Sequence, residues 1–170
     1  MKLFFTFLLS LVCSIPIAAI SADKTPITGN PAFDVLASWI GGEWRIDTRW
    51  DDGRPFRARG VWTWGPGKRF LTARTFALDD AGAETLLCEN IFAVASDHVV
   101  NYAFGSDGSV SAAPMNVSDG VVDSIWKSEG STLRQKMKII GPDEIGWEFF
   151  IQESDGKRRH TIAGAWLRKR

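Results

Sequence analysis

The chain has 170 residues, and its 20 basic and 20 acidic residues give a formal net charge of zero. With 45% hydrophobic and 24% charged residues, it has the size and composition of one ordinary domain. Basic residues gather only at positions 157–159 and 168–170. These clusters are too short for the extended basic face that nucleic-acid binding needs, so we expect solvated strand edges there and no nucleic-acid partner.

The N-terminus carries a targeting pattern. Lys2 precedes an apolar run over residues 3–20 that ends in small residues. This pattern predicts a secretory signal peptide, and the small side chains favour cleavage after Ala22, with Ala19 and Ser21 as alternative sites. The competing interpretation is a retained membrane anchor, because the run approaches the ~18 apolar residues of a spanning helix.

Pro16 and the small residues that follow it favour cleavage over an anchor. We therefore expect residues 1–22 to form a signal peptide and residues 23–170 to form one mature domain. The mature protein should be periplasmic or secreted, without membrane association after cleavage.

Cys88 is the one cysteine of the predicted mature domain, so no internal disulfide can form there. It follows Leu86 and Leu87 in an apolar run. We interpret it as a buried free thiol that packs as a small hydrophobe, with a catalytic nucleophile as the alternative.

One short amphipathic helix is predicted over residues 31–40. Apolar residues recur there at helical spacing, namely Phe33, Leu36, Ala37 and Ile40. Asn30 can cap the free amide groups of the first turn, and Gly41 and Gly42 release the chain at the far end.

The rest of the chain alternates between runs rich in Val, Ile, Thr, Phe and Trp and short Asp-Gly or Gly-Pro turns, which is typical of hairpin-connected strands. The predicted strands cover residues 43–51, 56–64, 69–79, 84–94, 98–105, 109–117, 121–128, 131–140, 145–153 and 158–168. Because no helical crossover fits between them, the pairing should be antiparallel. We predict an all-β fold, a single antiparallel up-and-down β-barrel of about ten strands with a short N-terminal α-helix.

Alternation along four strands predicts which side chains share a face. The apolar face of the first strand holds Trp44, Ile46, Thr48 and Trp50, and that of the eighth holds Leu133, Gln135, Met137 and Ile139. The last strand groups His160, Ile162, Gly164, Trp166 and Arg168, and the fifth groups His98, Val100, Tyr102 and Phe104. We expect these faces to point inward.

The third strand is ambiguous. Phe70, Thr72, Arg74, Phe76 and Leu78 alternate with Leu71, Ala73, Thr75 and Ala77, and either set can be buried. We favour the aromatic set inside, which encloses Arg74 and requires a partner for its charge. In the opposite register Arg74 is a solvated surface residue.

The short helix, the Gly42-Glu43-Trp44 entry to the first strand, the ladder of hairpins and an arginine in the last strand resemble the calycin group of lipocalins and fatty-acid-binding proteins. Within it, the chain is most similar to lipocalin-like bacterial domains of unassigned function. The resemblance implies that Trp44 packs at one end of the barrel against Arg168, a structural pair held by cation–π contact.

Nitrobindins share this architecture and hold haem through a histidine. This weaker resemblance implies His160 as a candidate iron ligand. The chain departs from them after the tryptophan, where Arg45-Ile46-Asp47-Thr48 replaces a glycine-rich stretch. We therefore predict no cofactor and no metal site, with haem on His160 as the alternative.

The leading functional hypothesis is an exported protein that encloses a small, largely apolar ligand in the barrel. The predicted wall residues are Trp50, Trp62, Phe76, Tyr102, Met137 and Phe149, and Arg74, His98, Tyr102 and Gln135 are predicted to orient a polar end. The alternative for these aromatic residues is a packed core, which eight tryptophans can fill without a cavity.

Two other classes of function stay open. One is an isomerase or lyase acting in the cavity, with His98, Tyr102, Glu89 and Glu148 as acid or base candidates, although no catalytic motif joins them. The other is a surface interaction protein with a filled barrel. Its first candidate surface is the strands at 109–117 and 121–128, where Pro114 favours an edge or a bulge.

Overall fold

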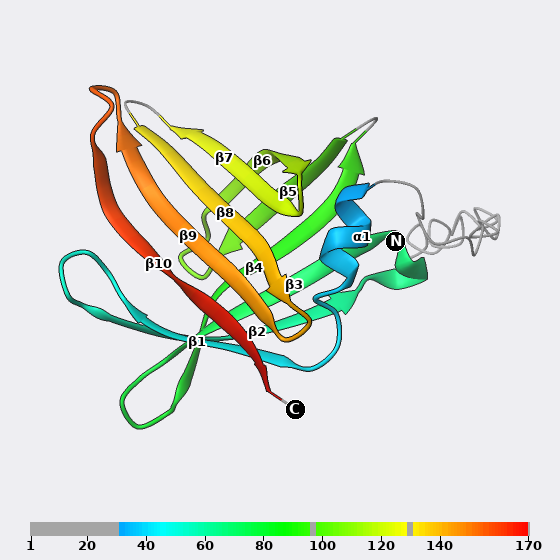
Figure 1. The fold of residues 1–170 in the computed structure, drawn as a ribbon, viewed down its shortest axis with the longest axis horizontal. Coiled ribbons are helices and arrows are strands. Elements are labelled where there is room, and N and C mark those ends of the chain that lie inside the picture. Colours follow the sequence, from blue (N-terminus) through cyan, green and yellow to red (C-terminus); the bar gives the residue numbers. More distant parts are fainter. Residues whose placement is uncertain (1–30, 96–97, 129–130, 170) are drawn as a thin grey trace, which may run out of the picture.

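A computed structural model describes residues 31–95, 98–128 and 131–169. The predicted signal peptide and the proposed helix cap Asn30 lie outside the described residues. The elements in order are α1 (Pro31–Ala37), β1 (Glu43–Arg49), β2 (Pro55–Trp64), η1 (Pro66–Lys68), β3 (Phe70–Leu78), β4 (Glu84–Ala95), β5 (His98–Gly105), β6 (Val110–Ser118), β7 (Val121–Ser128), β8 (Ser131–Gly141), β9 (Glu144–Glu153) and β10 (Arg158–Lys169) (Figure 1). Among these residues, no helix has the length and apolar character needed to span a membrane.

The ten strands form a closed barrel in which each strand pairs antiparallel with its neighbours in sequence, and β1 pairs with β10. The predicted up-and-down barrel is thus confirmed. Four hairpins at one end share the same three-residue turn, closed by left-handed glycines at Gly53, Gly82, Gly108 and Gly156 with φ of 86°, 82°, 84° and 83°. Glycine is required there because this conformation is strained for other residues.

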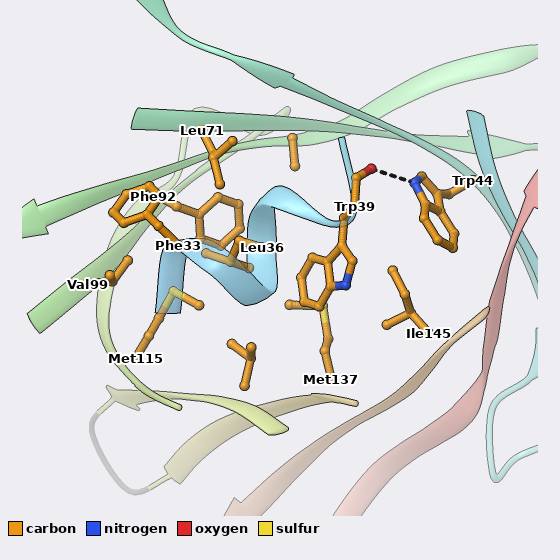
Figure 2. Packing of buried hydrophobic residues seen from close by; sticks show 12 residues of the cluster. Phe33, Leu36, Trp39, Trp44, Leu71, Phe92, Val99, Met115, Met137 and Ile145 are labelled. Atoms are coloured by element: carbon orange, nitrogen blue, oxygen red, sulfur yellow. Dashed lines mark hydrogen bonds between the residues drawn. The ribbon is translucent and has the colours of Figure 1, made fainter. Parts of the chain in front are cut away.

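The other end of the barrel is closed by α1 and the turn that follows it. Phe33, Leu36 and Trp39 point among strand side chains such as Phe92 and Met137 (Figure 2). The helix ends at Ala37, before the predicted residue 40, and the following turn carries Trp39 into the core with 1% of its surface exposed. The apolar core therefore lies at the α1 end.

Trp44 on β1 and Arg168 on β10 lie opposite each other near the α1 end, where the first and last strands pair. Trp44 is buried, and its indole nitrogen donates a 2.8 Å hydrogen bond to the carbonyl oxygen of Trp39 (Figure 2). The guanidinium of Arg168 lies 4.6 Å from the centroid of the Trp44 ring. The contact implied by the calycin resemblance is present.

The inward faces of β1 and β8 agree with the prediction. On β1, Trp44 and Ile46 are buried, while on β8 Met137 is buried and Ile139 packs against the core. In both strands the opposite face is charged, and that contrast sets the register.

The orientation that we favoured for β3 is wrong. Leu71 and Ala73 are buried in the interior, so Arg74 and Phe76 point outward. The Arg74 side chain is 61% exposed and lies 3.3 Å from a carboxylate oxygen of Glu89, while Phe76 lies under the guanidinium of Arg59 at 4.4 Å. An ion pair at the surface replaces the buried charge that the other register required.

The predicted inward face of β5 is also outside. Val99 and Asn101 are buried in the barrel, whereas His98 is exposed and Tyr102 and Phe104 are 37% and 38% exposed on the outer surface. The interior already holds large rings from β2, β9 and β10, so β5 contributes smaller side chains to it.

A bulge separates His160 from the face predicted for β10. The register shifts between Arg159 and Ile162, and His160 has a φ of 50°. Ile162 is buried, but His160 is exposed at the rim. The expected alternation therefore holds only after the bulge.

The barrel ladder is incomplete between β6 and β7. The two strands pair only from Met115↔Ser124 to Ser118↔Val121. Beyond this point β6 continues along β5 and β7 continues along β8 (Figure 1). Pro114 lies at the divergence and has no N–H to donate to β7. We call the region between residues 111–114 and 125–127 the β6–β7 seam.

Candidate ligand-binding site

A cavity of about 540 Å³ occupies the barrel away from α1. One group of its lining residues is aromatic and consists of Trp50, Phe56, Trp126, Trp147, Phe149 and Trp166. The polar lining residues are Thr75, Cys88, Asn90, Ser111, Lys127 and Gln135, and Leu87, Ala103 and Leu133 complete the wall. The volume falls in the range of small-molecule sites.

Trp147 is the centre of the aromatic wall. Its ring stacks on Phe56 with a centroid distance of 5.6 Å and on Phe149 at 6.3 Å. Trp166 meets it edge-on at 6.2 Å, and Trp50 packs edge-on against Phe149 at 6.2 Å. Since β1, β2, β9 and β10 supply these rings and β3 to β6 supply small or polar side chains, the cavity has one aromatic and one polar side.

A smaller space of about 50 Å³ lies between the large cavity and the core. Trp62, Met137 and Ile145 line it, together with Gln135 and Trp166, which also line the large cavity. A space of this size suits one or a few water molecules rather than an organic ligand.

The polar side of the cavity contains a short hydrogen-bond chain. The Asn90 amide nitrogen donates to Asn101 Oδ1 at 2.9 Å, and the Cys88 thiol donates to Asn90 Oδ1 at 3.4 Å. Burial raises the pKa of the Cys88 thiol, and a hydrogen bond with Thr75 partly opposes that shift. The thiol is therefore protonated at neutral pH, which argues against a nucleophilic role.

Several donors at the cavity have no strong acceptor in the protein. The indole nitrogens of Trp126 and Trp147 are buried and have no hydrogen-bond partner among the described residues. The Gln135 amide nitrogen reaches only Met137 Sδ, at 3.7 Å. Gln135 lines the large cavity, so a ligand with a hydrogen-bond acceptor can pair with its amide.

The structure brings together some of the residues predicted to bind ligand. Trp50, Gln135 and Phe149 line the large cavity, and Trp62 and Met137 line the small one. Their ligand-binding roles stay predictions. Arg74, Phe76, His98 and Tyr102 lie outside the barrel, so the orientation on which their predicted roles depended is wrong.

Sequence reasoning missed Trp126, Trp147, Trp166 and Lys127 as cavity residues. The sequence pattern could have identified Trp147, because it lies two residues from Ile145 and from Phe149 and therefore shares their face of β9. No sequence pattern identifies Lys127 as a cavity residue, since a lysine at a strand end normally points into solvent.

The acid and base candidates do not meet in the cavity. Glu89 pairs with Arg74 at 3.3 Å, and Glu148 pairs with Arg158 at 3.0 Å. Among the described residues, no histidine, aspartate or glutamate lines the large cavity.

His160 lies near Asp51 and Asp52 at the rim, within 4.8 Å between potential ligand atoms. Both carboxylates are engaged, since Asp51 accepts a hydrogen bond from the Thr161 amide and Asp52 accepts bonds from Arg54. The imidazole is exposed and does not line the cavity. These residues do not fit a haem enclosed in the barrel.

No protein-family model matches the chain, and no curated protein matches it significantly. Solved structures share its fold. Rv2717c from M. tuberculosis is 18% identical with a TM-score of 0.55, over 82% of this chain and 98% of that one. The S-type phycobiliprotein lyase CPES from Guillardia theta is 10% identical with a TM-score of 0.53, over 82% of this chain and 93% of that one. The chain therefore has a calycin-like barrel fold.

Proposed function

We propose that this protein binds a small, largely apolar molecule in its aromatic cavity. The observation that carries the proposal is the cavity of about 540 Å³, whose wall combines six aromatic residues with three aliphatic and six polar ones. This combination is typical of ligand sites, where apolar walls supply affinity and a few polar atoms orient the ligand.

The position of the cavity supports the same proposal. The side chains that hold the barrel together gather at the α1 end, where Leu36, Leu71 and Val122 are fully buried. The cavity lies apart from this core, so a ligand can enter without displacing it. The fold of the solved neighbours is compatible with binding but carries no ligand identity to this chain.

Fluorescence of N-phenylnaphthylamine, a neutral apolar dye, tests the proposal. The dye should brighten when it enters the cavity of the folded protein. Ala103→Leu fills the cavity wall and should weaken dye binding about tenfold. Ala112→Leu is the matched control, because Ala112 is exposed on the outer face of β6.

Absence of dye binding by the folded protein, or equal binding by Ala103→Leu and the parent chain, would refute the proposal. Circular dichroism of each variant checks that the barrel is intact.

We also propose export to the periplasm or secretion, supported by the pattern of residues 1–22. N-terminal sequencing of the protein expressed in a bacterial host tests it. A mature N-terminus at Asp23 is expected, and an uncleaved Met1 in the cytoplasm would contradict it.

A further inference from the structure

We propose that the ligand is an aromatic organic anion whose acidic end lies at Trp126 and Lys127, beside the β6–β7 seam. This inference rests on the proposed function, because it assigns the chemical class and orientation of the molecule in the same cavity. Three independent features of the cavity carry it.

The first feature is an excess of hydrogen-bond donors. Trp126 Nε1 and Trp147 Nε1 are buried without a partner, and an indole nitrogen can only donate. The Gln135 amide nitrogen adds a donor that meets only a sulfur atom. Buried unpaired donors are unfavourable. Gln135 lines the cavity, so a ligand with an oxygen acceptor satisfies its amide, and a ligand that offers only donors does not.

The second feature is the sign of the charge. Lys127 is the only charged residue among those lining the cavity, and no carboxylate lines it within the described chain. An ammonium group next to a low-dielectric cavity attracts an anion and repels a cation. Lys127 follows Trp126 directly, so the cation and one unpartnered indole belong to the same end of β7.

The third feature is access at the seam. Ser111 on β6 and Lys127 on β7 both line the cavity and are both exposed, so the cavity reaches solvent between these two strands. The ladder between β6 and β7 ends at Met115↔Ser124, short of both residues. A charged group held here stays partly hydrated, which avoids the penalty of full burial.

The aromatic side of the cavity indicates the chemical nature of the rest of the ligand. Trp147 lies nearly parallel to Phe56 and to Phe149, with interplanar angles of 23° and 17°, and all three rings line the cavity. An aromatic ligand makes offset-stacked or edge-to-face contacts with such rings, which a flexible alkyl chain cannot make. The cavity therefore suits an aromatic body with its anionic end toward the seam.

Three anthracene derivatives that share one ring system test the charge. Anthracenecarboxylate should bind more tightly than anthracenecarboxamide, and anthracenemethylamine should bind most weakly, as measured by quenching of tryptophan fluorescence. Lys127→Met should lower the affinity for the carboxylate about threefold to tenfold and leave the carboxamide unchanged. Lys138→Met is the matched control, since Lys138 is exposed on the outer face of β8.

Gln135→Leu keeps a side chain of similar size but removes the amide donor of the cavity. It should weaken the carboxylate and the carboxamide alike, because both present an oxygen acceptor. Myristate, a saturated anion of comparable carbon number, should compete poorly with anthracenecarboxylate.

The outcomes separate this inference from the proposed function. If N-phenylnaphthylamine binds but the three anthracenes bind equally, or if Lys127→Met preserves the carboxylate preference, the cavity binds ligands and the anion assignment is wrong. Tighter binding of myristate overturns the aromatic assignment. If neither the neutral dye nor any anthracene binds, the proposed function itself fails and this inference fails with it.

Discussion

Arg168 connects β10 to both Trp44 and the turn after α1. Its guanidinium lies 4.6 Å from the Trp44 ring centroid and donates a 2.6 Å hydrogen bond to the carbonyl oxygen of Ser38. Trp44 in turn donates to the carbonyl oxygen of Trp39. The first strand, the last strand and the helix turn are therefore held by one set of contacts, which closes the barrel at this end.

Trp44→Ala should lower the free energy of unfolding by about 3 to 5 kcal/mol, because it removes a large buried ring and leaves a cavity. Trp44→Phe should lower it by less, about 1 to 2 kcal/mol, since a ring remains and the hydrogen bond to Trp39 is lost. Urea unfolding measures both. Leu167→Ala is the control, because Leu167 is 54% exposed. A change under about 1 kcal/mol for Trp44→Ala would remove Trp44 as the structural anchor.

The contact between Trp44 and Arg168 should be energetically coupled. In a double-mutant cycle with Trp44→Leu and Arg168→Met, we expect a coupling free energy of about 0.5 to 2 kcal/mol, because the partly buried guanidinium lies over the ring face. Additive effects of the two substitutions would show that the contact contributes nothing beyond packing.

Two leucines should respond differently to truncation. Leu36 is fully buried in the core at the α1 end, so Leu36→Ala should cost about 2 to 5 kcal/mol of unfolding free energy. Leu133 lines the cavity and already borders empty space, so Leu133→Ala should cost about 1 kcal/mol. Equal losses in urea unfolding would contradict the division between a packed end and a hollow end.

Stability should fall at alkaline pH through Cys88. Burial raises its pKa in the folded protein, so between the unfolded and the folded pKa values the unfolded chain has lost a proton that the native protein retains. The stabilisation that the protonated Cys88 thiol gives the folded protein is complete below the unfolded pKa of about 8.5. It is lost as the pH rises through the folded pKa. Cys88→Ala should therefore flatten the decline in unfolding free energy above about pH 8.5. Parallel curves for the two proteins would assign the decline to other groups.

The sequence was sufficient for the strand order and for strands with one polar face. On β1 and β8, charged residues such as Arg45 and Lys136 alternate with apolar ones, and only one register can bury the apolar set. On β3 and β5 both faces carry apolar residues, so alternation alone could not orient them. The interior has a finite volume, and which strand fills it depends on rings from β2, β9 and β10 across the barrel.

Bulges limited the prediction of the site. The register between β3 and β4 shifts between Thr75 and Phe76, and the register between β9 and β10 shifts between Arg159 and Ile162. In each pair one strand carries one extra residue, so the alternation of its side chains reverses across the shift, and His160 leaves the face of Trp166 for this reason. Neither bulge has a glycine or proline that would have indicated it.

The separation between the α1 plug and the cavity has an evolutionary consequence. Substitutions at Phe149, Gln135 or Lys127 alter the hollow end, whereas folding depends chiefly on the contacts around Leu36, Trp39 and Trp44. Cavity residues can therefore diverge under selection for new ligands while the barrel remains foldable. A single scaffold of this kind can give rise to descendants whose binding preferences differ and whose backbones stay the same.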